Sequence, residues 1–125
     1  MVRLLILILF SIVFYGCVSS PKKYYEKHYQ TILCDELDGK MEYVLKDRTR
    51  VDCLTDEYAI EVDFAKKWAE SIGQSLYYAK MTDKKPAVGL IMDVSKDKRY
   101  YKRLNLIAKE YGIKIFVIEK IKQGK

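Results

Sequence analysis

The sequence has few of the residues that build soft-metal sites or flexible linkers. Its 125 residues include one histidine, three cysteines and two prolines, with no CxxC pair. A structural zinc site takes four Cys or His ligands at short spacings, so zinc is disfavoured, and His28 is expected to be a solvated helix residue. Internal repeats and low-complexity linkers are also missing. One compact domain is therefore expected.

Long hydrophobic runs are missing except at the N-terminus. Residues 4–15 are mostly apolar, follow Arg3 and precede Gly16 and Cys17. A bilayer-spanning helix takes roughly 20 apolar residues, so this run is short for one. A basic start, an apolar run and a small residue form the layout of a secretory signal. We therefore assign residues 1–20 to a signal or anchor and residues 21–125 to an exported domain.

The end of that segment resembles a bacterial lipoprotein signal, in which Cys17 would be lipidated and become the mature N-terminus. Phe14 and Tyr15 depart from the pattern of that family. An uncleaved N-terminal anchor is the second interpretation, and a cleaved soluble form is the third. All three place the domain in the cell envelope or outside the cell, and the first two attach it to a membrane.

The domain is basic, but its acidic residues are concentrated in one region. The chain holds 23 Lys and Arg against 17 Asp and Glu, a net charge of +6. Such a surface attracts nucleic acid or anionic lipid. The acidic residues cluster between Asp35 and Asp63, as expected for a metal-dependent enzyme that acts on a polyanion. Cys34 and Cys53 could form a disulfide in an oxidising compartment, and the sequence leaves that open.

Hydrophobic periodicity and turn residues predict eight elements in an α-β-β-β-α-β-α-β order. Helices are expected over residues 22–33, 64–80 and 96–111, and strands over residues 41–45, 50–54, 58–63, 88–94 and 113–118. The second half reads as a βαβ arrangement and the first half contains hairpins. The predicted fold class is α/β, with a mixed sheet flanked by helices on both sides.

Two neighbouring predicted strands carry acidic residues on one face. Side chains alternate along a strand, so Asp52 lies opposite to Cys53, and Glu61 shares a face with Asp63. A hairpin would set Asp52 beside Glu61. Crowded carboxylates repel unless a cation neutralises them, and hard oxygens prefer Mg²⁺ or Mn²⁺. An ordinary hairpin with a polar outer face would show the same alternation.

The helix that follows adds a row of polar side chains. Lys67, Gln74 and Tyr78 lie within about 40° of one another at 100° per residue. Taken singly, Lys67 could be a solvated lysine and Tyr78 an aromatic at the edge of the core. Gly73 costs a helix about 1 kcal/mol relative to Ala, and the close approach of a backbone or a substrate strand would explain it.

These residues resemble the PD-(D/E)XK nuclease superfamily, and the Gln-x-x-x-Tyr row is similar to its RecB-type and Holliday-junction-resolvase-like branches. The resemblance implies a restriction-endonuclease-like α-β-β-β-α-β core with an added C-terminal helix and strand. It implies that Glu42, Asp52 and Glu61 hold Mg²⁺ or Mn²⁺ for phosphodiester hydrolysis. Gln74 and Tyr78 match the helix motif that positions the substrate and the site.

One residue departs from the family pattern. Asp63 stands where the family has its catalytic lysine, and Lys67, one turn later, could supply the missing charge. Arg50, Lys84 and Lys85 would contact phosphates. The expected function is a metal-dependent nuclease that acts on nucleic acid, with DNA favoured. The alternative is an inactive envelope lipoprotein of the same fold that binds nucleic acid or a protein, and the sequence leaves open whether the chain forms a homodimer.

Overall fold

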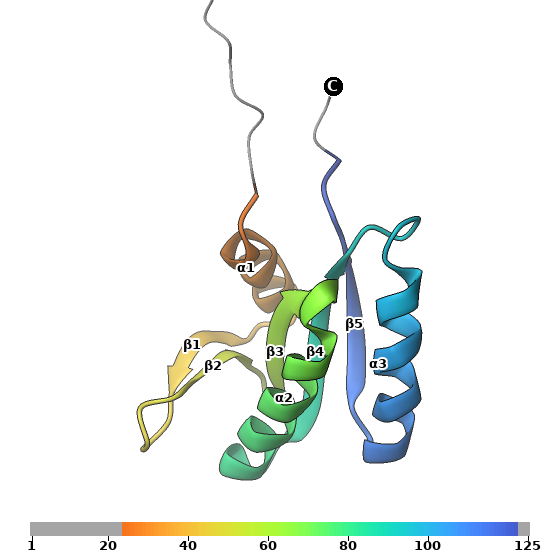
Figure 1. Cartoon of the computed structure of the whole chain (residues 1–125). Coiled ribbons are helices and arrows are strands. Elements are labelled where there is room, and N and C mark those ends of the chain that lie inside the picture. The colour runs from red at the N-terminus through yellow and green to blue at the C-terminus, as the bar shows by residue number, and fades with distance from the viewer. Residues whose placement is uncertain (1–23, 123–125) are drawn as a thin grey trace, which may run out of the picture.

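The chain forms a five-stranded sheet with three helices, described for residues 24–122 in a computed structural model. The elements are α1 Glu26–Glu36, β1 Lys40–Val44, β2 Arg50–Leu54, β3 Tyr58–Phe64, the 3-10 turn η1 Ala65–Lys67, α2 Trp68–Thr82, β4 Lys85–Met92, α3 Lys98–Tyr111 and β5 Lys114–Glu119. The predicted element order is confirmed, as are the α/β class and the mixed sheet. Figure 1 shows the arrangement.

Predicted and observed bounds differ where the chain enters or leaves an element. The first helix begins at Glu26 and not at residue 22, and the fourth strand begins at Lys85 and not at residue 88. The 64–80 helix is split, because its first turn is the 3-10 helix η1, a common form of a helix N-terminus. Gly112 ends α3 in the left-handed conformation, as predicted.

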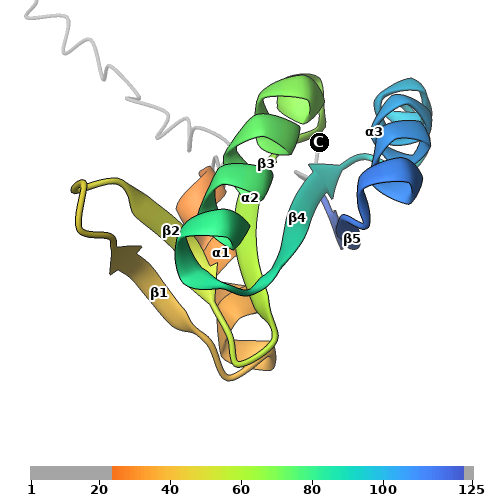
Figure 2. The same ribbon diagram turned by 90° about the horizontal axis from the view of Figure 1, so that it is seen from below.

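The strands lie in the order β1-β2-β3-β4-β5. The first three form an antiparallel meander, and β3, β4 and β5 are parallel. The two parallel connections run through α2 and α3 and step in the same direction along the sheet. Because such crossovers are right-handed, both helices must cover one face. Helix α1 covers the other face, as Figure 2 shows.

Strand β4 is the centre of the core because helices cover both of its faces. Val88, Leu90 and Met92 pack in the cluster with α2 and α3, while Ala87 and Ile91 pack with α1. Its near-continuous apolar run is typical of a buried parallel strand. Gly89 allows α1 to pack closely here, because a Cβ would lie 2.8 Å from Leu33 Cδ2 and that side chain would have to move.

A disulfide joins α1 to the hairpin. Cys34 and Cys53 are both fully buried and bonded, with their Cα atoms 5.6 Å apart. The chain turns back beside the bridge at Gly39, where a Cβ would lie 2.4 Å from Cys53 Sγ. The pairing that the sequence left open is therefore formed. It fixes the helix against the strand that carries Asp52.

Within residues 24–122 no helix is long and apolar enough to cross a membrane. The predicted signal, with Cys17, lies outside the described residues.

We expect reduction of Cys34–Cys53 to lower the free energy of unfolding by about 3 kcal/mol, because a chain loop of this size gains freedom when it is opened. Urea unfolding with and without dithiothreitol measures the change, and thiol titration verifies reduction. A Cys34→Ala/Cys53→Ala variant is the control, since its unfolding midpoint should not respond to reductant. An unchanged midpoint in the fully reduced native chain would contradict the prediction.

Candidate functional site

Strands β2 and β3 separate at the point where their acidic residues lie. The ladder pairs Cys53 with Ile60 and Leu54 with Ala59, and no pair is formed beyond these. In place of a strand carbonyl, the Asp52 carboxylate oxygen Oδ2 accepts the Val62 N–H at 2.8 Å. This fork leaves room for side chains between two backbones. It places the Asp52 carboxyl beside Glu61, where the two side chains share a hydrogen bond.

Glu61 and Asp63 are among the most buried charged side chains of the described chain. They are 6% and 3% exposed, and they share one face of β3, opposite to Ile60 and Val62, which pack with α1. The Glu61 oxygen Oε2 is buried, and no group within residues 24–122 donates a hydrogen bond to it. A buried carboxylate oxygen without a partner is costly. Folding alone therefore leaves this oxygen of the fork without the hydrogen bond or cation that would offset the cost of burying it.

Lys67 brings a positive charge to the rim of the fork. Its ammonium lies 3.4 Å from Asp63 Oδ1, and the Phe64 N–H also donates to that oxygen, at 2.9 Å. The side chain of Lys67 stays half exposed while that of Asp63 is buried. The negative charge of Asp63 raises the pKa of Lys67. The predicted approach of Lys67 to Asp63 is observed.

Helix α1 contributes Glu26, a residue that the sequence did not single out. Its side chain shares a hydrogen bond with Asp63, and burial together with this neighbour raises the pKa of Glu26 to about 7. Glu26 and Gln30 are one helical turn apart, and Gln30 is only 3% exposed. Two polar residues at a spacing of four on the packed side of a helix are the signal that could have found them.

Gln30 joins α1 to both strands of the hairpin. Its amide nitrogen Nε2 donates to the Asp52 carbonyl at 2.7 Å and to Glu42 Oε1 at 3.0 Å. Glu42 has a φ of +53°, a left-handed conformation inside a strand that interrupts the regular alternation of side chains. Arg50 Nε lies 3.6 Å from the other Glu42 oxygen. The strained backbone conformation of Glu42 thus occurs where its side chain accepts the hydrogen bond from Gln30.

Burial and mutual repulsion oppose the full ionisation of the carboxyl groups at the fork. Burial, followed by the charges of Asp52 and Asp63, raises the pKa of Glu61 to about 9. Burial also raises the pKa of Asp52 to about 6, although the Val62 N–H acts in the opposite direction. Near neutral pH the Glu61 carboxyl group keeps its proton and donates a hydrogen bond to the Asp52 carboxylate. We call Glu26, Asp52, Glu61 and Asp63 the carboxylate cluster.

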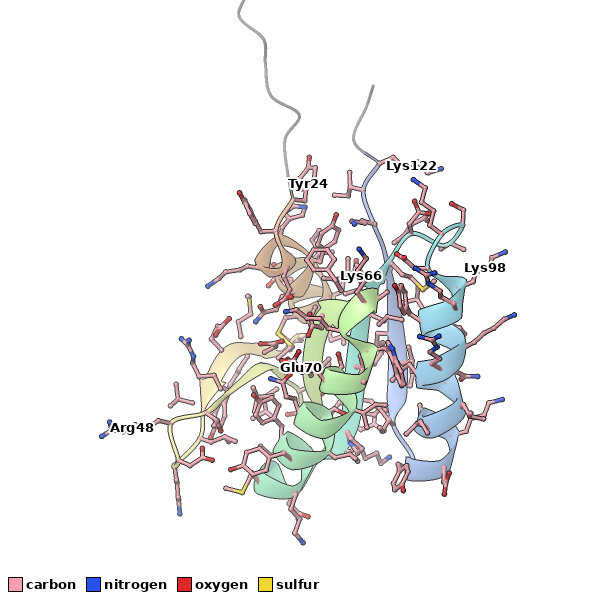
Figure 3. The ribbon with its side chains drawn as sticks, viewed as in Figure 1. Tyr24, Arg48, Lys66, Glu70, Lys98 and Lys122 are labelled. Atoms are coloured by element: carbon pink, nitrogen blue, oxygen red, sulfur yellow. A yellow bond between two sulfur atoms is a disulfide. The ribbon has the colours of Figure 1, made fainter. Side chains whose placement is uncertain are left out.

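Gln74 and Tyr78 lie one turn apart on α2 and share a hydrogen bond. Tyr78 is buried against Val51 and Ala59. Burial raises the pKa of Tyr78, and the charges of Glu61 and Asp52 raise it further. The phenol therefore lies close enough to the cluster to sense its charge. Figure 3 shows the side chains of α2 over this part of the sheet.

The three residues predicted to bind phosphate lie in two different places relative to the carboxylate cluster. Lys85 is paired with Tyr58 in the sheet, at the opposite end of β3 from Asp63. There Lys85 forms an ion pair with Glu57 at 2.9 Å, and Lys84 donates to the Asp56 carbonyl. Arg50 is near the fork and pairs with Glu42. Phosphate binding by Arg50, Lys84 and Lys85 stays a prediction, but two of them lie away from the site.

Gly73 has no partner in the fold that explains it. A Cβ at this position would meet nothing within 4 Å. The described part of the chain therefore offers no close backbone contact there, and a substrate strand is the explanation that stays a prediction.

No ready-made metal centre exists among residues 24–122, because no three His, Cys, Asp or Glu side chains have their donor atoms gathered closely enough. The donor chemistry nevertheless fits a hard divalent ion, since the cluster offers only carboxylate oxygens. The unpartnered oxygen of Glu61 fits the same role. No protein family, curated protein or solved structure matches this chain.

We expect the stability of the metal-free protein to fall as the pH rises. The folded-state pKa of Glu61 is raised from 4.5 to about 9. The stability that its protonation contributes is therefore complete below about pH 4.5, falls as the unfolded chain releases its proton above that pH, and is lost as the pH passes 9. Glu61→Gln mimics the protonated form and should be more stable than the parent chain at pH 8 by about 2 kcal/mol. Thermal unfolding in EDTA at pH 5 and 8 measures both.

The control for this experiment is Glu57→Gln, an exposed glutamate just before the same strand, at the end away from Asp63. It should change stability little at either pH. A parent chain equally stable at both pH values would contradict the assignment of the proton to Glu61.

Proposed function

We propose that the chain is a metal-dependent phosphodiesterase that cleaves nucleic acid, with DNA as the favoured substrate. The observation that carries the proposal is the buried Glu61, whose Oε2 has no partner, within a fork that also gathers Asp52, Asp63 and Glu26. Such an assembly gains most from a cation. Hydrolysis of a phosphodiester is the reaction that a carboxylate-held divalent ion serves best.

The finer fold assignment is part of the same proposal. The α-β-β-β-α-β order, the Asp52–Glu61 pair and the Gln74–Tyr78 pair support a restriction-endonuclease-like core of the PD-(D/E)XK type. Asp52 and Glu61 would hold Mg²⁺ or Mn²⁺, with Glu42 reaching the same region through Gln30. The bound ion would supply a water of lowered pKa and offset negative charge.

The chain's own groups would perform the remaining tasks. Lys67 lies at the rim of the fork and would stabilise the charge that develops on the phosphate. Release of its ion pair with Asp63 would free the ammonium for this contact. Glu26 shares a proton with Asp63 and is placed to accept one from water. Gln74 and Tyr78 would position a substrate strand along α2.

One observation favours a second candidate, an inactive relative that binds nucleic acid or a protein. Asp63 occupies the position of the family's lysine, and its carboxylate pairs with Lys67. A lysine engaged in that way offers less charge to a phosphate. In either case we infer that residues 1–20 export the domain and that Cys17 attaches it to a membrane of the cell envelope.

Asp52→Asn and Glu61→Gln should each lower Mg²⁺-dependent cleavage of plasmid or branched DNA at least about 100-fold. These variants remove a metal ligand but keep an acceptor for the Val62 N–H and the shape of Glu61. Asp56→Ala, an exposed acid outside the cluster, is the control and should cleave normally. A parent chain that cleaves none of these substrates and binds neither Mg²⁺ nor Mn²⁺ by calorimetry would exclude the proposal.

Lys67→Ala tests the role of this lysine in the first candidate. In an active enzyme it should lower kcat about 100-fold while the affinity for Mn²⁺ stays the same or rises, because Lys67 repels cations and acts on the phosphate. Lys66→Ala, its exposed neighbour, is the matched control. Single-turnover cleavage and metal titration measure the two effects. Undiminished cleavage by Lys67→Ala would remove this residue from the mechanism.

A further inference from the structure

The two ends of the parallel strands differ sharply in charge. The segments that leave β3, β4 and β5 at their carboxyl ends are residues 64–67, 93–99 and 119–122, which together hold seven Lys and Arg against three Asp and Glu. The segments at the opposite end are residues 35–40, 55–58, 82–85 and 112–114, with four Lys against six Asp and Glu. We call the first set the basic end.

This separation is large compared with electrostatic screening. Strand β4 has eight residues, so the two ends lie roughly 25 Å apart at 3.3 Å per residue. The Debye length is about 8 Å at physiological ionic strength. An approaching anionic surface therefore senses the basic end without the acidic groups at the other end.

Apolar side chains are exposed in the basic end and beside it, at the start of α1. Tyr25, Val94 and Ile121 are 69%, 46% and 39% exposed. Tyr25 precedes α1, Val94 lies in the loop after β4, and Ile121 follows β5, where its N–H donates to the Tyr29 hydroxyl at 3.2 Å. Lysines interspersed with a tyrosine and aliphatic side chains match the headgroup region of a bilayer, where both kinds of group are accommodated.

The chain enters the described domain at the same end. Figure 3 shows Tyr24 and Lys122 together at one extremity, with Lys66 and Lys98 on the same side of the molecule and Arg48 at the far hairpin tip. The 23 residues before Tyr24 include the apolar run at 4–15. Attachment through that run would place this end of the described domain nearest to the point of attachment.

We propose that the basic end rests on an anionic membrane surface as a second contact beside the N-terminal segment. Each Lys or Arg held near an anionic lipid surface is attracted to it, so the basic end would add to the hold of the N-terminal segment. In this orientation Lys67 lies near the lipid headgroups, while the β1–β2 hairpin projects away from them (Figure 3). The proposal concerns the surface alone and does not depend on cleavage.

Hydrogen exchange of the full chain reconstituted in vesicles tests it. Amides of residues 93–97 and 119–122 should exchange at least about tenfold more slowly on phosphatidylglycerol–phosphatidylcholine vesicles than on pure phosphatidylcholine. The difference should disappear in 0.5 M salt. Residues 55–58 and 112–114, at the opposite end, should exchange equally on both.

Matched charge variants identify the surface. Lys96→Gln/Lys98→Gln/Lys122→Gln should lose the protection, while Lys40→Gln/Lys80→Gln/Lys114→Gln, with the same change in net charge, should keep it. Equal exchange on the two lipids, or protection that survives the first triple variant, would overturn the proposal. Protection of the same amides by an oligonucleotide but not by phosphatidylglycerol would also overturn it and assign the surface to nucleic acid.

Discussion

The hydrogen bond from the Val62 N–H to the Asp52 carboxylate is the contact on which the site depends. A side chain here takes the place of a strand carbonyl, so the ladder between β2 and β3 ends and the fork opens. Without the fork, Glu61 would lie against a neighbouring strand, with no room for partners. With it, the carboxyl groups of Glu61, Asp52, Asp63 and Glu26 lie near enough to interact, and burial followed by the neighbouring charges raises the pKa of Glu61. Their mutual repulsion then has to be offset by protons or by a cation.

Contacts from the surrounding structure stabilise this arrangement although burying the carboxyl groups is unfavourable. Helix α1 is fixed to β2 by the Cys34–Cys53 bridge, and one turn earlier Gln30 bonds both strands of the hairpin. The left-handed φ of Glu42 is a further local cost, accepted where its carboxylate meets Gln30. Strain, burial and an unpartnered oxygen thus occur together within a few residues. Such a concentration is typical of functional sites and unusual in purely structural hairpins.

The position of the site relative to the charged ends bears on how it could meet a polyanion. Asp63 and Lys67 lie where β3 ends, next to the basic end, whereas Lys84 and Lys85 lie at the other end in contacts with Asp56 and Glu57. A long anionic ligand reaching the fork would therefore gain more from Lys66 and Lys67 than from the lysines of the 82–85 loop. If the protein were attached to a membrane at that end, such a ligand would compete with anionic lipid for the same lysines.

The amino-acid sequence by itself determined the α/β class, the order of the elements and the pairing of acidic residues on adjacent strands. Those features follow from local rules: the period of apolar residues, turn residues such as Gly112, and the alternation of side chains along a strand. The approach of Lys67 to Asp63 was also predictable, because one helical turn separates them.

Only the tertiary structure decided which helix would complete the cluster and which cysteines would pair. Glu26 and Gln30 reach Asp63 and Asp52 from α1, which docks across the sheet from sequence positions more than 20 residues away. Left-handed Glu42 breaks the strand alternation that sequence reasoning assumes. Burial of Glu61, and hence its raised pKa, depends on contacts from three elements at once. No local pattern encodes such contacts, because packing of the whole domain creates them.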